Sequence, residues 1–316
     1  SLIVGHQTTG TLDAAQYNVA VGTTALDALT TGDNNVAVGY NALTANTTGS
    51  YNTASGYQSL YANTTGSRNT ASGQESLKSN TEGDKNTASG YNSLYSNTTG
   101  DENTASGYYS LFANTTGTRN IAIGYRAYDN ADAEDDNLAI GYDALGGSIA
   151  GGEYNVAIGN YSLDANTSGD YNTALGYASL GANTTASYNT AIGWQSMLAT
   201  AGAGTFNTGV GARSLETNTT GDDNTAVGVN SMFSNSTGNE NTGVGRNSLY
   251  ATTGSYNTSL GWYSGNEITS GTYNTVIGHN ASASGATAVQ QIVIGAGATG
   301  TGDNEIALGN TSISAI

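Results

Sequence analysis

The sequence predicts an all-β fold, a parallel β-solenoid (β-roll) of about 19 coils of about 17 residues each. Three observations predict it. First, the motif Asn-(Thr/Val/Ile)-Ala-x-Gly recurs every 17 residues from Asn18 to Asn137, and every 16 to 18 residues from Asn155 to Asn274. Second, a unit of this length matches one coil, which buries its apolar face only by stacking on its neighbours. Third, the 316 residues include no proline, as expected where each coil donates backbone hydrogen bonds to the next. Degenerate copies begin at Ser1, Gln291 and Glu305.

The first five positions of a coil, counted from its Asn, predict a short strand. Positions 2 and 4 are β-branched, aliphatic or Ser and lie on one face, whereas the small residue at position 3 lies on the other. A small residue implies close approach of the opposite coil wall or of another chain. The Asn at position 1 is expected to form a ladder of amides, and the Gly at position 5 a turn with positive φ or close packing. The ladder residues are Asn52, Asn69, Asn86, Asn103 and Asn120, and the turn residues are Gly56, Gly73, Gly90 and Gly107.

The rest of the coil predicts turns and a charged corner. An aromatic residue at position 6 and Leu at position 9, such as Tyr57 and Leu60, predict a short helical turn facing inward, with a second short strand as the alternative. Asn63–Gly66 is typical of a turn. Position 17 should face water, where opposite charges in successive coils contribute about 0.2–1 kcal/mol per pair. These charges are Lys85, Glu102, Arg119 and Asp136.

Residues 1–316 are interpreted as a single repeat domain, with an irregular coil at 120–136 and a shorter terminal coil at 291–316. The copies from Asn52 to Asn103 read Asn-Thr-Ala-Ser-Gly, so their strands lack aliphatic side chains. With Thr and Ser inside, a lone stack of coils would have a poor core. We therefore expect the solenoid to rely on partner chains, and closed symmetry favours a homotrimeric rod.

The charge balance bears on possible partners. Seven basic residues against 24 acidic ones give a net charge of −17, which argues against binding to nucleic acid or to anionic membranes. No apolar run is long enough to span a bilayer, and no signal peptide is recognisable. The chain opens inside a repeat, so we expect a fragment or a processed product. The absence of Cys excludes disulfides and thiolate metal sites.

The units Asn52–Gly66, Asn86–Gly100 and Asn103–Gly117 resemble repeats of phage-type tail fibres and large bacterial surface fibres. Asn155–Gly159 also resembles the head repeats of trimeric autotransporter adhesins, whose period is usually nearer 14. The run Ile306–Ile316 resembles the segment that precedes an endosialidase-type intramolecular chaperone. These resemblances imply a trimeric fibre at an extracellular, virion or injection-particle surface, with Ile316 near a maturation boundary.

Catalytic and metal chemistry find little support. His6 and His279 are the only histidines and lie at opposite ends of the repeat array, so a Ser-His-acid arrangement is not expected. No catalytic residue and no obligatory cofactor is therefore predicted. The irregular coil is the one candidate metal site, since its carboxylates could bind Ca²⁺ through oxygen ligands; an acidic surface loop is the alternative. The five acids are Asp129, Asp132, Glu134, Asp135 and Asp136.

Aromatic residues of the C-terminal half are candidate contact residues. Trp194, Trp262 and Tyr263, with His279 in the position usually held by Tyr, could contact a sugar or a protein, or could simply pack. The leading hypothesis is a fibre or adhesin segment, not an enzyme, that binds a cell-surface glycan or protein. Ice binding is an alternative, although the conspicuous Thr pairs fall in turns. A polysaccharide-degrading enzyme is a second alternative.

Overall fold

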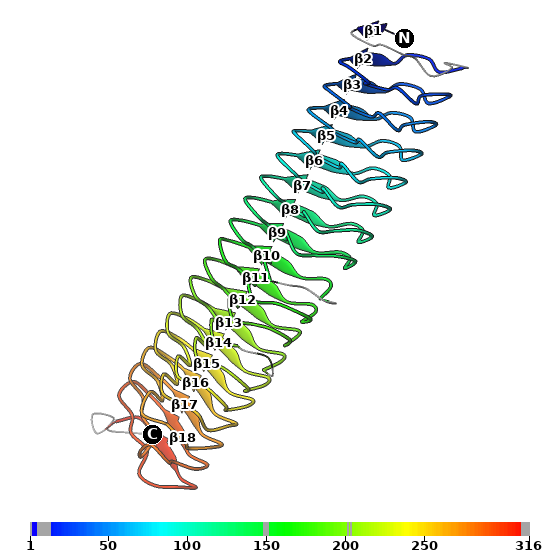
Figure 1. Ribbon diagram of the computed structural model, residues 1–316. Coiled ribbons are helices and arrows are strands. Elements are labelled where there is room, and N and C mark those ends of the chain that lie inside the picture. The colour runs from blue at the N-terminus through cyan, green and yellow to red at the C-terminus, as the bar shows by residue number, and fades with distance from the viewer. Residues whose placement is uncertain (1, 5–13, 148–151, 201, 203, 311–316) are drawn as a thin grey trace. The chain divides into compact units, whose positions relative to one another are not determined.

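The computed structural model describes residues 2–4, 14–147, 152–200, 202 and 204–310, and over these residues it is a parallel β-solenoid. Each coil contributes one strand of three residues (Figure 1). The chain divides into two compact units, residues 1–155 and residues 156–316. The first unit holds β1 (Leu2–Val4), β2 (Val19–Val21), β3 (Val36–Val38), β4 (Thr53–Ser55), β5 (Thr70–Ser72), β6 (Thr87–Ser89), β7 (Thr104–Ser106), β8 (Ile121–Ile123) and β9 (Leu138–Ile140). The second holds β10 (Val156–Ile158), β11 (Thr173–Leu175), β12 (Thr190–Ile192), β13 (Thr208–Val210), β14 (Thr225–Val227), β15 (Thr242–Val244), β16 (Thr258–Leu260), β17 (Thr275–Ile277), β18 (Ile292–Ile294) and β19 (Ile306–Leu308).

Successive strands within each unit pair in parallel and in register. Thr53 lies beside Thr70 and Ala54 beside Ala71, and the same correspondence holds from coil to coil. Equivalent residues therefore form columns, as the repeat predicts. The shorter interval near the C-terminus keeps this register, because Ile292 pairs with Ile306. His6 and the proposed boundary at Ile316 lie outside the described residues.

The core is formed by positions 1, 3, 8, 9 and 12 of the coil. In the coil of β4, Ala54, Ser59, Leu60 and Asn63 are all fully buried, and burying one Leu contributes about 1.5–3 kcal/mol. Thr53 and Ser55 point to solvent. The prediction that Thr and Ser would lie inside and weaken the core is therefore wrong. The homotrimer loses that support and stays a prediction.

Position 3 is small because it faces the opposite wall of its own solenoid. A Cβ added to Gly209 would lie 2.8 Å from Ser196 Oγ and 3.0 Å from Met197 Cγ, both of the preceding coil. Of the two explanations for the small residue, the close approach of the coil wall is the one that the structure shows.

The predicted helical turn at positions 6 to 9 is wrong, and the alternative strand is also absent. Gln58 and Leu60 have φ of 53° and 50°, so left-handed residues alternate with others and no helix can propagate. Their amides bond to neighbouring coils: Gln58 N–H to Tyr40 O at 2.9 Å, and Leu60 N–H to Ser76 O at 3.0 Å. This twist turns Leu60 inward and leaves Tyr57 about half exposed. Among the described residues no helix is long and apolar enough to cross a membrane.

Two columns of buried asparagine join the coils. At position 1, Asn86 Nδ2 donates to Gly100 O of its own coil (2.7 Å), and Asn86 Oδ1 accepts from the Asn103 amide of the next (2.9 Å). Asn52, Asn69, Asn103 and Asn120 repeat this pattern. At position 12 the amides bond directly to one another, as from Asn63 Nδ2 to Asn46 Oδ1 (2.8 Å). The columns satisfy polar groups that would be costly to bury unpaired.

The glycine at position 5 is required on two counts. Gly90 has φ of 137°, and a Cβ there would lie 2.4 Å from the carbonyl oxygen of Gly107 in the next coil. Gly56, Gly73 and Gly107 are in the same situation. Both expectations for this position, positive φ and close packing, are therefore met at once.

Candidate binding surface

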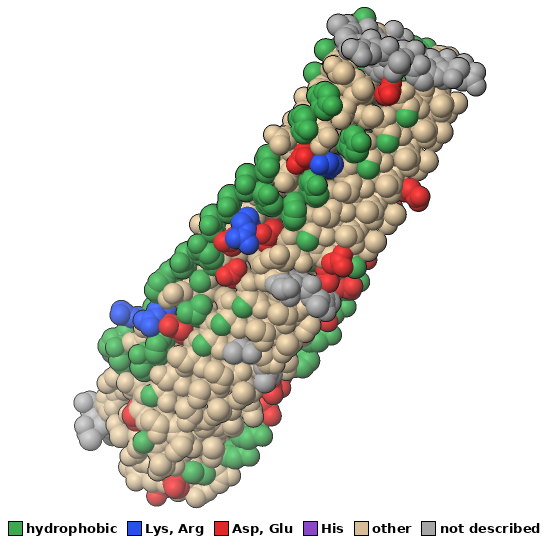
Figure 2. Space-filling view, viewed as in Figure 1, with side chains coloured by type: hydrophobic (Ala, Val, Ile, Leu, Met, Phe, Trp, Pro, Cys, Tyr) green, Lys and Arg blue, Asp and Glu red, His purple; other side chains and the backbone are tan. Residues whose placement is uncertain are grey.

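Positions 6 and 17 point outward, positions 7 and 10 are mostly half-buried beside them, and all four carry the side chains that change from coil to coil. Figure 2 shows hydrophobic side chains gathered in rows on the visible face. At position 6, Tyr91, Tyr108, Tyr125 and Tyr142 form a row whose rings stack with centroids 5.1, 5.3 and 5.0 Å apart. Because the rings cover one another's faces, the row offers ring edges and hydroxyl groups to a ligand.

The four aromatic candidates divide into a cluster and a single residue. Trp262 stacks on His279 of the next coil (4.7 Å, 16°) and packs at an angle against Tyr263 (4.2 Å, 53°). Trp194 occupies position 6 of the β12 coil and is half exposed. All three position-6 residues are thus outward-facing, and Trp262 and His279 also pack on each other. On the opposite side of Trp262, position 6 holds Arg246 instead of a ring.

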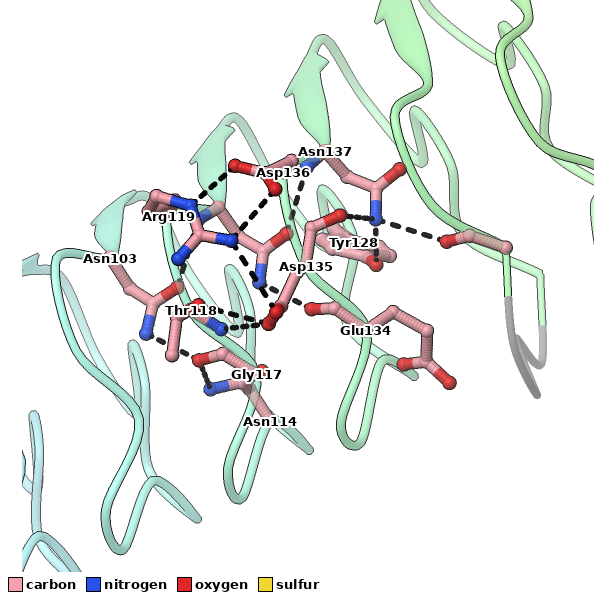
Figure 3. A network of polar contacts seen from close by, with 12 residues as sticks. Asn103, Asn114, Gly117, Thr118, Arg119, Tyr128, Glu134, Asp135, Asp136 and Asn137 are labelled. Atoms are coloured by element: carbon pink, nitrogen blue, oxygen red, sulfur yellow. Dashed lines mark hydrogen bonds and ion pairs between the residues drawn. The ribbon is translucent and has the colours of Figure 1, made fainter.

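The irregular coil keeps the shape of the others because its substituted residues fill the same places (Figure 3). Tyr128 replaces the buried Leu, and its hydroxyl oxygen accepts a hydrogen bond from Asn137 Nδ2 at 2.7 Å. Burial raises the pKa of Tyr128 well above its usual value. Glu134 stands in the place of the turn glycine, and its backbone carbonyl accepts from Asn120 Nδ2 at 2.7 Å.

The five acids of this coil are engaged one by one. Asp129 pairs with Arg126 (2.6 Å), and Asp136 and Asp135 with Arg119 (2.6 and 3.5 Å). Asp135 Oδ1 also accepts from the Thr118 backbone amide at 2.6 Å.

The remaining two acids bond to nearby donors. Glu134 Oε2 accepts from the amides of Asp132 and Ala133 (2.9 and 3.2 Å), and Asp132 Oδ1 accepts from Thr115 Oγ1 (2.5 Å). Among residues with described positions, no three acidic or His side chains come together as metal ligands. The structure therefore does not assemble the predicted Ca²⁺ site, because each carboxylate already accepts from a donor of the protein, and Asp135 and Asp136 share Arg119.

The pKa values of two of these carboxyls are shifted in opposite directions. Burial raises the pKa of Asp129, although the bond from Arg126 opposes the shift. The bond from the Arg119 guanidinium lowers the pKa of Asp136, which is better exposed. The predicted charged corner is confirmed at two steps, Lys85–Glu102 (2.6 Å) and Arg119–Asp136.

One cavity was not predicted from the sequence. It measures about 390 Å³ and is lined by Asn230, Arg246, Asn247, Tyr250, Tyr263 and Asn266. These residues come from positions 6, 7 and 10 of three successive coils, those of β14, β15 and β16. The sequence does contain a signal: Arg246 is the one Arg or Lys at position 6, where an aromatic residue is common.

Fold and surface together define a parallel β-solenoid repeat protein. A scan against models of protein families and a search of curated proteins found no match to this chain.

Proposed function

We propose that this chain is a structural fibre or adhesin segment that presents a binding surface to a glycan or protein on a cell. The observation that carries the proposal is the contrast between the inner and outer columns. Position 9 is buried Leu or Met in coil after coil, as at Leu94, Met197 and Leu249. Position 6 changes from Tyr to Gln, Trp, Arg and His on the same backbone.

Such a contrast is typical of a scaffold whose interior is fixed and whose exterior carries recognition. Repeated coils also offer many nearly equivalent sites, and multivalency turns weak contacts into useful avidity. The resemblance of the repeats to tail-fibre and adhesin repeats supports the same conclusion. It further suggests a homotrimer at an extracellular or virion surface, matured by a C-terminal chaperone.

Two measurements test the proposal. Multi-angle light scattering should give three times the mass of one chain, and the fluorescently labelled protein should bind intact cells or a glycan array. The trimer should bind cells or glycans more tightly than any monomer fraction, because three copies bind together. A monomeric protein that binds neither cells nor glycans at micromolar concentration would contradict the proposal.

One observation favours a second candidate, binding to an ordered surface such as ice. The sequence drew attention to Thr pairs in turns, but the strands β4 to β7 also present Thr at position 2 and Ser at position 4 outward. In-register pairing makes two parallel rows of hydroxyls, one coil apart along each row. Thermal hysteresis of the pure protein, abolished by Thr70→Tyr, would support this candidate, and its absence would exclude it.

A polysaccharide-degrading activity would require turnover on a glycan panel that one carboxylate substitution removes.

A further inference from the structure

Arg246 differs from the other six basic residues, all of which lie in the described part of the chain. Five of them are paired with carboxylates: Lys78 with Glu75, Lys85 with Glu102, Arg119 with Asp135 and Asp136, Arg126 with Asp129, and Arg213 with Glu216. The sixth, Arg68, lies 6.0 Å from the ring centre of Tyr51. The side chain of Arg246 is exposed and has neither kind of partner among the described residues. In a chain with 24 acidic residues, an unpaired guanidinium is conspicuous.

The cavity beside Arg246 is polar, and two of its amides are unsatisfied. The Asn247 side chain is more than nine-tenths buried, and its Oδ1 has no hydrogen-bond partner. Oδ1 of Asn230, at the same position one coil earlier, is also buried without a partner. Both oxygens have almost no exposed surface, so each amide must turn toward the cavity to accept from a ligand hydroxyl. A buried acceptor without a donor costs about 1–3 kcal/mol, which that bond would recover.

The cavity also has an aromatic side. Tyr250 and Tyr263 line it, and the Tyr263 ring packs against Trp262. The cavity therefore combines a free cation, two amide oxygens that require donors, and ring surface. A ligand that satisfies all three carries a carboxylate, neighbouring hydroxyls and a ring with apolar C–H groups.

We propose that this cavity binds a carboxylated pyranose, an acidic sugar unit of a surface polysaccharide. Arg246 holds the carboxylate with two parallel hydrogen bonds, and the amides of Asn230 and Asn247 turn to accept from ring hydroxyls. The net charge of the protein repels anions in general, so the attraction is local to Arg246 and weakens as salt is added. This inference rests on the proposed function and names the chemical class of its glycan.

The chain offers its own reporters for a test. With 5-fluorotryptophan the protein has two ¹⁹F signals, one from Trp262 beside the cavity wall and one from Trp194 four coils earlier. Titration with sodium D-glucuronate should move the Trp262 signal saturably, with a dissociation constant on the order of 1 mM for so small a ligand, and leave Trp194 unchanged. D-Glucose, which has the same hydroxyl-bearing ring without the carboxylate, should bind at least tenfold more weakly.

Arg246→Gln should weaken glucuronate binding at least tenfold, whereas Arg68→Gln, which removes an exposed Arg of the other unit, should not. An unchanged Trp194 signal shows that the second unit, which holds the cavity, is folded in each variant. Equal binding of glucose, an equal response to sodium acetate, or no effect of Arg246→Gln would overturn the proposal.

The two proposals fail separately. If wild type and Arg246→Gln both bind cells or a glycan array but neither binds glucuronate, the cavity assignment is wrong and the adhesin function stands. If glucuronate binds but no surface does, the adhesin function is wrong and the sugar site stands.

Discussion

Replacing Asn86 with Ala tests whether the inner asparagine column holds the coils together. The substitution removes the only acceptor for the Asn103 amide, whose distance to Asn86 Oδ1 is 2.9 Å. It also removes one of two side-chain donors to Gly100 O, which keeps the bond from Asn97 Nδ2. An orphaned buried amide costs about 1–3 kcal/mol and a lost second bond about 0.5–1.5, so we expect a loss of about 2–4 kcal/mol in the free energy of unfolding.

The neighbouring residue is a matched control. Thr87 follows Asn86 directly and is exposed on the outer face of β6, so Thr87→Ala should change the free energy of unfolding by about 0.5 kcal/mol or less. Both variants are compared by urea denaturation. Because unfolding of a repeat array can be broad, amide hydrogen exchange is measured as well.

Hydrogen exchange gives a directional result. In Asn86→Ala, the Asn103 amide should lose protection, while the Asn86-position amide keeps it because its acceptor, Asn69 Oδ1, is intact at 2.9 Å. If the Asn103 amide stays protected, or if Thr87→Ala is as destabilising as Asn86→Ala, the column does not bond as described.

Three further substitutions, with Gly285→Ala as a control, test the turn glycine and the irregular coil. Gly90→Ala should lower the free energy of unfolding by about 1–3 kcal/mol through backbone strain alone, and the clash of the new Cβ adds to this. A Cβ at Gly285 meets nothing within 4 Å, so Gly285→Ala should be nearly neutral. Calorimetry compares the two variants. Asp129 has a raised pKa, so its contribution to stability is present below the unfolded-state pKa of about 3.9 and is lost as pH rises through the folded-state pKa. Asp129→Asn should therefore raise Tm at pH 7 and leave Tm unchanged near pH 2. Asp136 has a lowered pKa, so its contribution to stability is present above the unfolded-state pKa of about 3.9 and is lost as pH falls through the folded-state pKa. Asp136→Asn should therefore lower Tm at pH 7. A change of Tm in the same direction for both variants at pH 7 would contradict these two pKa shifts.

The periodicity was enough to predict the coil and its columns, because a strict register of Asn and Gly can be satisfied only by stacking. It could not predict which strand face is buried, since alternation separates two faces without saying which is inside. The small size of Ala54 was the relevant clue, because two walls of a narrow coil approach each other there. β-Branched residues at position 2 suggested the opposite.

The local twist that follows the glycine at position 5 could not be predicted from the sequence either. Tyr57 and Leu60 have a helix-like spacing. The left-handed conformations of Gln58 and Leu60, however, place the Tyr57 side chain outside the coil wall and the Leu60 side chain inside it. Such conformations cost about 1–2 kcal/mol per residue and persist because amides bond between coils. For the binding surface, the exposed Trp262 could be anticipated, but the isolation of Arg246 depends on where every carboxylate lies.

The identical strands of β4 to β7 have a consequence for how this chain folds. A slip of one coil would pair Thr53 with Thr87 instead of Thr70, yet would still place Ala on Ala and Asn on Asn. Native and shifted alignments therefore differ little in energy within this segment, which creates kinetic traps during folding. Coils with unique contents remove the ambiguity: the Tyr128 hydroxyl finds its Asn137 partner at a single alignment, so the least regular coil fixes the order of the most regular ones.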